Sequence, residues 1–464
     1  MRKKLLAIIS VILASCILFS CVACGSKQNN NEMLADATKE ETNAETTEKT
    51  EYEQVELSVA NLLSDFSRSA KYDVIVSDQM VKALNNFTFA MNKLVTKKDG
   101  KNVIVSPLSA FICLAMLANG TNGESRVQME KVLGMRIEDL NESLYAFVNG
   151  LYTSENCKMS IADSFWFRDA DGVLNVRDEY LQVIADWYDA EIYKAKFDND
   201  TLNDINNWCS NKTDGLIDKI LDSIPSNAMM YLINAVLFDA KWEVEYKDSN
   251  VIKDYTFNNY NGTTKNVTML RSSESVYLTG TDCIGTRKNY EGGKYSLVTL
   301  LPNKGVDIYN FISSLDANKW KSIMDSRFKN WEYDVDLLMP EFKTESEMGL
   351  NEVLQTMGMV DIFSPKADLT GIAKCSVGDL VVSNVKQKAY IEVTREGTKA
   401  AAVTIVEVVA TSVGPNETKT VSIILDRPYV YAIVDNSTDR PYVYAIVDNS
   451  TGCPIFIGAN INLG

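Results

Sequence analysis

The absence of histidine limits the chemistry open to this chain of 464 residues. A Ser-His-Asp or Cys-His site needs an imidazole to accept the nucleophile's proton near neutral pH, so both mechanisms are excluded. Histidine-ligated zinc and iron sites are excluded with them. Ser383-Asn384-Val385-Lys386 fits the S-x-x-K pattern of serine–lysine enzymes, but neither S-D-N nor K-T-G occurs in the chain. Such a short pattern arises often by chance, so we expect no enzymatic activity, metal site or cofactor.

The composition indicates a folded protein that does not bind nucleic acid. Hydrophobic residues make up 46% of the chain, which is enough for a large core, and length alone would favour two or three domains. The net charge of −16 provides no basic face to neutralise phosphates.

Nine cysteines divide into an N-terminal group and a scattered group. Cys21-Val22-Ala23-Cys24 has the C-x-x-C spacing, but its N-terminal location makes redox chemistry improbable. The scattered cysteines show no metal-binding spacing and are expected to be small buried hydrophobic residues. They are Cys113, Cys157, Cys209, Cys283, Cys375 and Cys453.

The N-terminus has the features of a secretory signal. Basic residues 2–4 precede an apolar run over residues 5–19, so we predict a signal peptide at residues 1–20. Leu18-Phe19-Ser20-Cys21 resembles the lipobox of bacterial lipoproteins, with Cys24 as the alternative lipid site. The prediction is secretion across a bacterial cytoplasmic membrane and lipid anchoring at the cell surface; the alternative is secretion without lipid.

An acidic segment follows the signal. Residues 32–56 carry nine acids and two bases and almost no large apolar side chains. This composition cannot bury enough surface to offset chain entropy, so residues 21–76 are predicted to be a lipidated N-terminus and a disordered tether.

The remaining chain alternates helix and strand patterns. Ser77 precedes a helical apolar stripe formed by Met80, Leu84, Phe87, Ala90, Met91 and Leu94. Residues 160–169 and 229–242 are strand-like apolar runs, and residues 178–188 are helical. Residues 295–305 end in a turn signal. In residues 379–397 the apolar side chains Val385, Ala389, Ile391 and Val393 alternate as in a strand. The predicted class is α+β with a substantial sheet.

Residues 396–412, EGTKAAAVTIVEVVATS, combine loop-like ends with a strand-like centre. Glu396-Gly397 precedes the centre and Gly414-Pro415-Asn416 follows it. One face of the strand is uncharged and mostly small: Thr398, Ala400, Ala402, Thr404, Val406, Val408 and Ala410. A segment that moves from a loop into a sheet needs small inward side chains and a flexible glycine at its bend. The alternative is a permanently paired strand.

Five separated blocks resemble the serpin family in order and spacing. They are residues 102–134, 232–246, 338–372, the segment EGTKAAAVT at 396–404, and the closing segment DRPYVYAIVDNSTGCPIFIGANIN. The resemblance implies a single domain over residues 77–464, with about nine helices around three sheets and an exposed reactive-centre loop at 395–420.

The resemblance also implies a suicide mechanism, in which a protease cleaves the loop and the freed segment enters the main sheet. It assigns a hinge to Glu396, Gly397, Thr398, Lys399, Ala400, Ala401 and Ala402. Ser106, Ser109 and Asn234 match a polar cluster called the shutter, and Trp242 matches the aromatic residue at the breach, where the loop first enters. Gln387 replaces the histidine that the family usually has in the shutter, so we expect a hydrogen-bonded cluster without a charge switch.

In inhibitory serpins the scissile bond lies at a nearly fixed distance from the hinge glycine, so the resemblance implies a scissile bond at Thr411-Ser412, with Ala410-Thr411 as the alternative. No lysine or arginine occurs between Lys399 and Lys419, so trypsin-like proteases are not expected targets. The small apolar residues favour elastase-like or subtilisin-like serine proteases, with papain-like cysteine proteases as a weaker alternative. We expect a monomer that forms a covalent complex with its target and contacts a membrane only through the lipid. Alternative functions are a non-inhibitory carrier or a surface-binding lipoprotein.

One repeat is exact: DRPYVYAIVDNST occupies residues 426–438 and again 439–451. The family's last hairpin needs one such strand. We expect the second copy, which adjoins the closing segment, to fill that strand, and the first copy to bulge out or to pair at an edge.

Overall fold

The structure is a computed structural model that describes residues 52–69, 71, 74–151, 154–169, 174–374, 380–398, 419–436 and 453–464. Over these ranges it contains nine α-helices and three sheets of four or six strands, so the predicted α+β class and serpin-type architecture are confirmed. Several predictions fall outside the described residues: the signal peptide, the lipid sites Cys21 and Cys24, the hinge residues 399–402, the reactive-bond residues 410–412 and the second repeat copy.

The helices agree with the sequence patterns where these were assigned. Ser77 caps the first helix, since its Oγ accepts a hydrogen bond from the Met80 backbone N–H at 3.2 Å. The helices are α1 (Asp78–Val95), α2 (Pro107–Ala118), α3 (Gly123–Leu133), α4 (Ile137–Asn149), α5 (Asp178–Trp187), α6 (Asn199–Lys212), α7 (Ile308–Ser314), α8 (Ala317–Asp325) and α9 (Asn351–Met357). Short 3₁₀ turns are η1 (Leu62–Asp65), η2 (Asp248–Asn250), η3 (Ser326–Phe328) and η4 (Asp361–Phe363). No helix in the described ranges is long and apolar enough to cross a bilayer.

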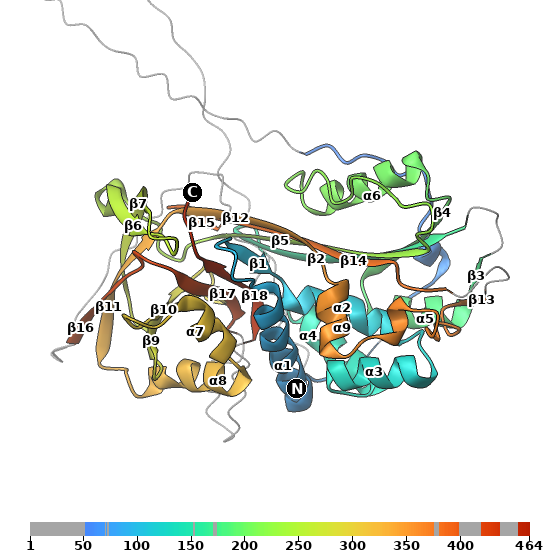
Figure 1. Ribbon diagram of the computed structural model, residues 1–464, viewed down its shortest axis with the longest axis horizontal. Helices are drawn as coiled ribbons and strands as arrows, with labels where there is room; N and C mark the ends of the chain where they lie inside the picture. The colour runs from blue at the N-terminus through green and yellow to red at the C-terminus, as the bar shows by residue number, and fades with distance from the viewer. Residues whose placement is uncertain are drawn as a thin grey trace, which may run out of the picture. The chain divides into compact units, whose positions relative to one another are not determined.

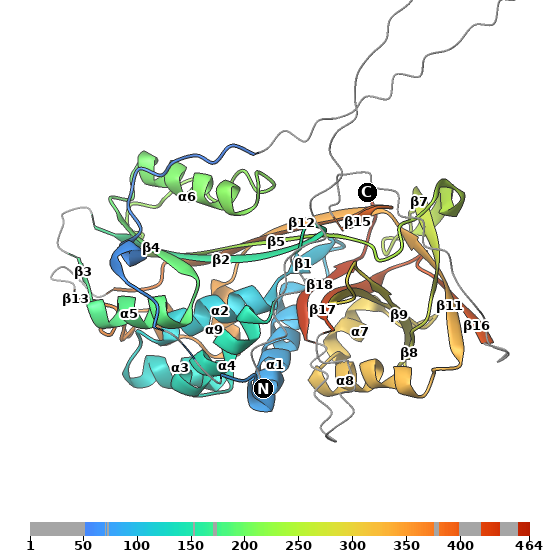
Figure 2. The same cartoon turned by 180° about the vertical axis from the view of Figure 1, so that it is seen from behind.

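One of the two six-stranded sheets is here called the main sheet. Its order is β12 (Phe342–Gly349), β14 (Asn384–Val393), β15 (Gly397–Thr398), β5 (Met230–Lys241), β2 (Cys157–Arg168) and β4 (Ala190–Ala195). Helix α6 lies over one face, and α1 to α5 and α9 lie on the other side (Figures 1 and 2). Every residue of α2 is buried, because this helix packs between the main sheet and the rest of the core.

Two further sheets and a short ladder complete the fold. The second sheet has the order β1 (Val103–Val105), β18 (Pro454–Asn460), β17 (Tyr429–Asp435), β10 (Tyr295–Pro302), β9 (Cys283–Asn289) and β8 (Tyr277–Thr279). The third sheet has the order β16 (Lys419–Ile424), β11 (Tyr333–Pro340), β7 (Thr264–Glu274) and β6 (Val251–Asn258). A ladder joins β13 (Ala373–Lys374) to β3 (Asn175–Val176). The reactive-centre loop would connect β15 to β16, and so the main sheet to the third sheet.

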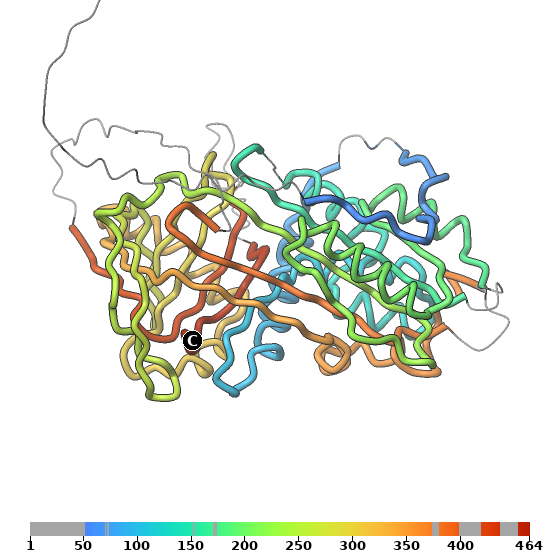
Figure 3. The backbone as a smooth tube through the Cα atoms, turned by 90° about the horizontal axis from the view of Figure 1, so that it is seen from above, coloured from blue at the N-terminus to red at the C-terminus, as the bar shows by residue number. Residues whose placement is uncertain are grey.

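The prediction of a disordered tether as far as residue 76 is wrong for residues 52–69. This segment runs beside α6 (Figure 3) and is fixed by specific hydrogen bonds. The backbone N–H and Oγ of Ser58 donate to the Asp204 carboxylate at 2.9 and 2.5 Å, and the Asn211 side chain bonds both the N–H and the C=O of Val55. The amino-acid composition predicted disorder because it counts the acidic residues of the whole segment. It contains no information about the individual hydrogen-bond partners on α6.

The prediction for the repeat is also wrong: the first copy supplies β17. Tyr429–Asp435 pairs with β10 on one side and with β18 on the other. The two copies have identical side chains, so packing within the strand cannot distinguish them. The lengths and contacts of the segments that join each copy to its neighbouring strands must therefore determine which copy forms β17. Only residues 425–428 separate β17 from β16. Backbone hydrogen bonds from Leu425 N–H to Leu338 O (2.9 Å) and from Asn258 N–H to Asp426 O (2.7 Å) hold this link.

The repeat provides a matched pair of variants. Tyr429 is fully buried and its hydroxyl accepts a hydrogen bond from Asn460 Nδ2 at 2.7 Å. Tyr429→Ala should lower the free energy of unfolding by about 3–5 kcal/mol, as expected for loss of a buried aromatic ring. Tyr442→Ala, the same change in the second copy, should leave the free energy of unfolding, measured with urea, unchanged. Equal effects of the two substitutions would show that the copies exchange in the strand.

Candidate functional site

The candidate site is the seam between β5 and β14 in the centre of the main sheet. At one end of the seam the two strands pair directly and in parallel, with Asn384–Lys388 opposite Tyr231–Ala235. At the other end β15 lies between them, antiparallel to both. Along the intervening residues, 236–239 of β5 and 389–392 of β14, no described strand fills the seam. The sheet is therefore closed at one end and wedged open at the other.

Gly397 is required by the close approach of β15 to β5. A Cβ atom at this position would lie 2.2 Å from the Ala240 backbone oxygen, a distance that no side chain can tolerate. Glycine at residue 397 therefore lets the second and third residues of the predicted hinge, Gly397 and Thr398, pair as a strand. Glu396 and Thr398 are also described, and the other four hinge residues lie outside the described ranges.

The predicted breach residue Trp242 holds the chain at the point where it turns into β15. Its backbone N–H donates to Glu396 O at 3.0 Å, and its indole Nε1–H donates to Thr394 O at 2.9 Å. The indole ring stacks on Tyr290, with 4.6 Å between centroids and an interplanar angle of 11°. The Tyr290 and Thr398 hydroxyls are 2.5 Å apart, so the hinge residue Thr398 contacts this aromatic stack through its side chain.

A buried ion pair supports this aromatic stack. The side chain of Lys288 is 4% exposed, and its Nζ lies 3.2 Å from the Glu274 carboxylate and 5.3 Å from the Trp242 ring centroid. The ammonium group therefore makes both a charge-assisted hydrogen bond and a cation–π contact. The resemblance did not assign Lys288, Tyr290 or Thr394, because their roles follow from contacts between distant segments.

The closed end of the seam contains three of the four predicted shutter residues. The Gln387 side-chain amide bonds the backbone of Ser106 twice: Oε1 accepts from the N–H at 3.0 Å, and Nε2 donates to the C=O at 2.9 Å. Gln387 Nε2 also donates across the seam to Asn234 Oδ1 at 3.1 Å. The hydroxyl of Ser106 donates to Ile455 O at 2.9 Å and so ties the start of α2 to β18.

The fourth predicted shutter residue, Ser109, is buried but its hydroxyl lacks a hydrogen-bond partner within the described part of the chain. A buried hydroxyl without a partner costs about 1–3 kcal/mol. Ser109 therefore lies at the predicted place but does not join the hydrogen-bonded cluster of the closed seam.

A carboxyl group extends the shutter cluster beyond the predicted residues. Asn234 Nδ2 donates to Asp163 Oδ1 at 2.6 Å. Asp163 is 3% exposed, and burial raises its pKa to about 7 against the lowering effect of the Asn234 hydrogen bond. Asp163 thus adds a titratable group beside the predicted hydrogen-bonded cluster, in which Gln387 itself cannot ionise. The sequence placed Asp163 in an apolar run but did not show that it faces Asn234.

Two lysines of β14 anchor the segment that follows α6. Lys386 Nζ donates to Ile220 O at 2.9 Å and to the Glu347 carboxylate at 2.5 Å. Lys388 Nζ donates to Lys219 O at 3.0 Å and lies 2.8 Å from the Glu345 carboxylate. Residues 219–220 are thus tied over the closed end of the seam, and a strand that entered here would have to release them.

The remaining nucleophilic side chains considered in the sequence, Ser383 and the scattered cysteines, show no catalytic arrangement in the described part of the chain. The hydroxyl of Ser383 accepts from the N–H of Met229 at 2.8 Å, and Lys386 is engaged as above, so the S-x-x-K pattern forms no Ser–Lys pair. The five described scattered cysteines are free and buried, as predicted. Burial raises the pKa of the Cys157 thiol to about 12, which keeps it protonated.

The Tyr290–Thr398 contact can be measured by a double-mutant cycle. Tyr290→Phe and Thr398→Val should each lower the free energy of unfolding by about 1–2 kcal/mol, because each leaves a buried hydroxyl without its partner. The double variant should show a coupling energy of about 1 kcal/mol in urea unfolding. Additive effects would mean that the hinge residue and the tyrosine do not interact.

Comparison with known proteins agrees with this geometry. Residues 82–439, well over half of the chain, match the family model described as serpin (serine protease inhibitor). Human Serpin B3 is 28% identical over 355 residues, which cover 71% of this chain and 89% of Serpin B3.

Solved structures show the same fold. The thermophilic serpin tengpin in its native state has a TM-score of 0.79 and 36% identity, over 87% of this chain and 100% of tengpin. Tengpin in its latent state has a lower TM-score of 0.71, at 34% identity over 85% of this chain and 100% of that structure. Human thyroxine-binding globulin with its ligand shares the fold at 21% identity and a TM-score of 0.69, over 83% of this chain and 98% of the globulin. With a half-open main sheet, a glycine-led hinge and a family match over most of its length, the chain belongs to the serpin family.

Proposed function

We propose that this protein inhibits serine proteases by inserting its cleaved reactive-centre loop into the seam of the main sheet. The protease's serine attacks a loop carbonyl, an ester bond to the enzyme forms, and the peptide bond breaks to release a new amino terminus. The residues before the cut then enter the seam as a strand and carry the esterified protease with them. The observation that supports this most directly is β15, which already begins such a strand between β5 and β14.

The open part of the seam provides the driving force. Residues 236–239 of β5 and 389–392 of β14 offer backbone groups that a new strand can pair with on both sides. Each hydrogen bond gained contributes about 1 kcal/mol net. Continuing insertion to the closed end would separate Asn234 from Gln387, so the shutter contact opposes insertion while the rest of the seam favours it.

Thr398 defines which face of the loop would turn inward. Its hydroxyl contacts the buried Tyr290, so Thr398 points into the core. Strand side chains alternate, and residues 400, 402, 404, 406, 408 and 410 would share the face of Thr398. All six are alanine, threonine or valine, which fit between the sheet and the helices with little overpacking.

The loop sequence favours particular targets. The predicted reactive bond Thr411-Ser412, or Ala410-Thr411, presents small residues and no cation. Elastase-like and subtilisin-like serine proteases accept such residues, whereas trypsin-like enzymes require lysine or arginine. Papain-like cysteine proteases remain the second class to test.

The N-terminal sequence sets the proposed location. A lipid on Cys21, or on Cys24 as the alternative, would anchor the inhibitor outside the cytoplasmic membrane after removal of residues 1–20. The proposed inhibitor is a monomer held at the cell surface. The rival function is a non-inhibitory carrier, since thyroxine-binding globulin has the same fold.

A protease panel distinguishes inhibitor from carrier. Elastase-like or subtilisin-like enzymes should form a complex that survives denaturing gel electrophoresis, because an ester bond joins the two chains. Trypsin-like enzymes should not. The loop-cleaved protein should also melt well above the intact protein in calorimetry, since its sheet gains a strand. Cleavage without a complex and without a rise in melting temperature would favour the carrier.

Gly397→Ala tests the hinge. The added Cβ would collide with the Ala240 backbone oxygen, so β15 should be displaced and insertion should begin more slowly. We expect the fraction of cleaved inhibitor that ends as covalent complex to fall by about tenfold, corresponding to about 1.4 kcal/mol in the competition between insertion and hydrolysis. Gly414→Ala, beyond the predicted reactive bond, is the matched control and should keep the wild-type fraction. An unchanged fraction in Gly397→Ala would argue against insertion through β15.

A further inference from the structure

Asp163 lies in a row of side chains that crosses the main sheet. In the β2–β5 ladder it is directly opposite Asn234, and in the β5–β14 ladder Asn234 is opposite Gln387. The side chains follow the same order: Asp163 accepts from Asn234, which accepts from Gln387. The carboxyl group is therefore one hydrogen bond away from the contact that closes the seam.

The Asp163 carboxylate receives little compensation for its burial. Among the described residues Asn234 is its only hydrogen-bond donor, and no cation contributes to its pKa. A carboxylate has about four acceptor sites, so one donor from the described residues leaves most of these sites without a protein partner. An ionised Asp163 thus destabilises the closed arrangement around it.

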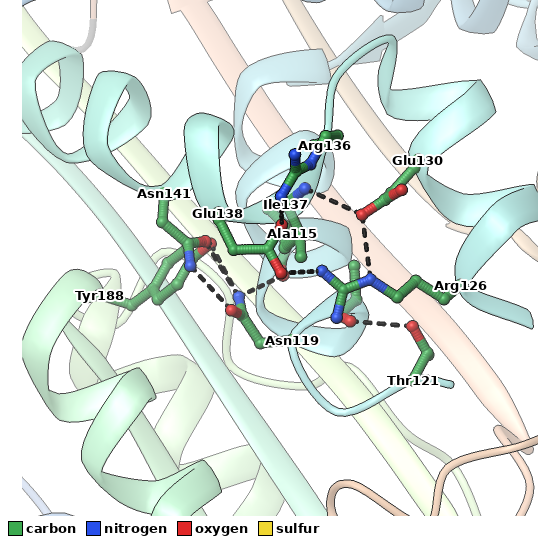
Figure 4. A network of polar contacts seen from close by, with 11 residues as sticks. Ala115, Asn119, Thr121, Arg126, Glu130, Arg136, Ile137, Glu138, Asn141 and Tyr188 are labelled. Carbon is green, nitrogen blue, oxygen red and sulfur yellow. Dashed lines mark hydrogen bonds and ion pairs between the residues drawn. The ribbon is translucent and has the colours of Figure 1, made fainter. Parts of the chain in front are cut away.

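The neighbouring polar groups satisfy one another instead of Asp163. The Tyr188 hydroxyl donates to Asn141 Oδ1 at 2.5 Å, and Asn119 donates to Tyr188 and to Asn141 (Figure 4). At the rim of the small cavity beside Asp163, Arg68 pairs with Asp189 at 3.6 Å. None of these groups supplies the carboxylate with a second donor.

We propose that Asp163 is a positioning residue for loop insertion, and that its ionisation loosens the closed end of the seam through Asn234. Insertion is then slow when Asp163 is protonated and fast when it is charged. This inference rests on the proposed inhibitory function, and it adds a pH threshold that belongs to this shutter cluster.

Proton linkage gives the direction of the effect. Burial raises the pKa of Asp163 to about 7 in the closed seam. Opening the seam admits water to the carboxylate and brings its pKa back toward the ordinary value, so opening releases a proton. The open fraction therefore rises with pH up to the closed-state pKa and levels off above it.

Few other groups titrate in this range. The chain has no histidine. The thiol of Cys113 on α2 and the hydroxyl of Tyr188 after α5 both have pKa values raised by burial, so they stay protonated. Glu341 near the hinge is the other described carboxyl whose pKa is raised, chiefly by burial, and it needs a control.

The test is hydrogen–deuterium exchange of the full chain, corrected for the intrinsic pH dependence of amide exchange. The amides to follow are those of residues 231–235 and 384–388, which pair at the closed end. Between about pH 5.5 and about pH 8 the opening constant should rise by about tenfold in the wild type. Asp163→Asn keeps the size and the acceptor oxygen but cannot ionise, so its opening constant should be low and independent of pH. Glu341→Gln should retain the wild-type profile.

Each outcome has a defined meaning. A flat wild-type profile overturns the proposal without reference to any variant, which matters if Asp163→Asn folds poorly. A pH dependence that persists in Asp163→Asn assigns the effect to another group and also overturns it. Exchange is measured without a protease, so failure of the protease panel would remove the inhibitory function while leaving this result readable. With an inhibited protease, the ratio of complex to cleaved product in wild type relative to Asp163→Asn should rise over the same pH interval.

Discussion

The structure depends on the incomplete pairing of β5 with β14. These two strands pair directly over only five residues each, and β15 holds them apart at the other end. Backbone groups in between can gain a partner only if the chain supplies one. The described hinge residues, the aromatic stack at Trp242 and the polar cluster at Gln387 all lie along this one seam. In the proposed mechanism, both ends of the seam therefore act on the same step, insertion of the loop.

The two ends are held by different forces. At the open end, Trp242 and Tyr290 bind the turn into β15 through ring stacking and hydrogen bonds to backbone and hydroxyl groups. At the closed end, Gln387 clamps the start of α2 and reaches Asn234 across the seam. In the proposed mechanism, the first set positions the entering strand and the second resists its progress. A kinetically held native state needs both.

Charge placement adds a second layer of control. Lys386 and Lys388 tie the segment after α6 over the seam, while the buried carboxyl of Asp163 lies beneath it. The lysines are satisfied by carbonyl and carboxylate oxygens and stabilise the closed form. Asp163 has a single donor among the described residues, and in our proposal it destabilises that form when ionised. These opposing contributions act on neighbouring strands. A small change in either contribution can therefore shift the equilibrium between the closed and the open form of the seam.

The sequence by itself determined the fold class and the family, because periodicity and motif order are local properties of the chain, and through the family resemblance it predicted the hinge and shutter residues. The helix capped by Ser77 and the strand around Val385 needed no tertiary information. Tertiary structure alone decided that Asp163 faces Asn234, since strand register sets which residues meet. It also chose between two identical repeat copies and ordered residues 52–69 against α6. Identical side chains cannot show which repeat copy forms β17, and average composition cannot show whether residues 52–69 are ordered. The chain connections decide the first question, and contacts between distant segments decide the second.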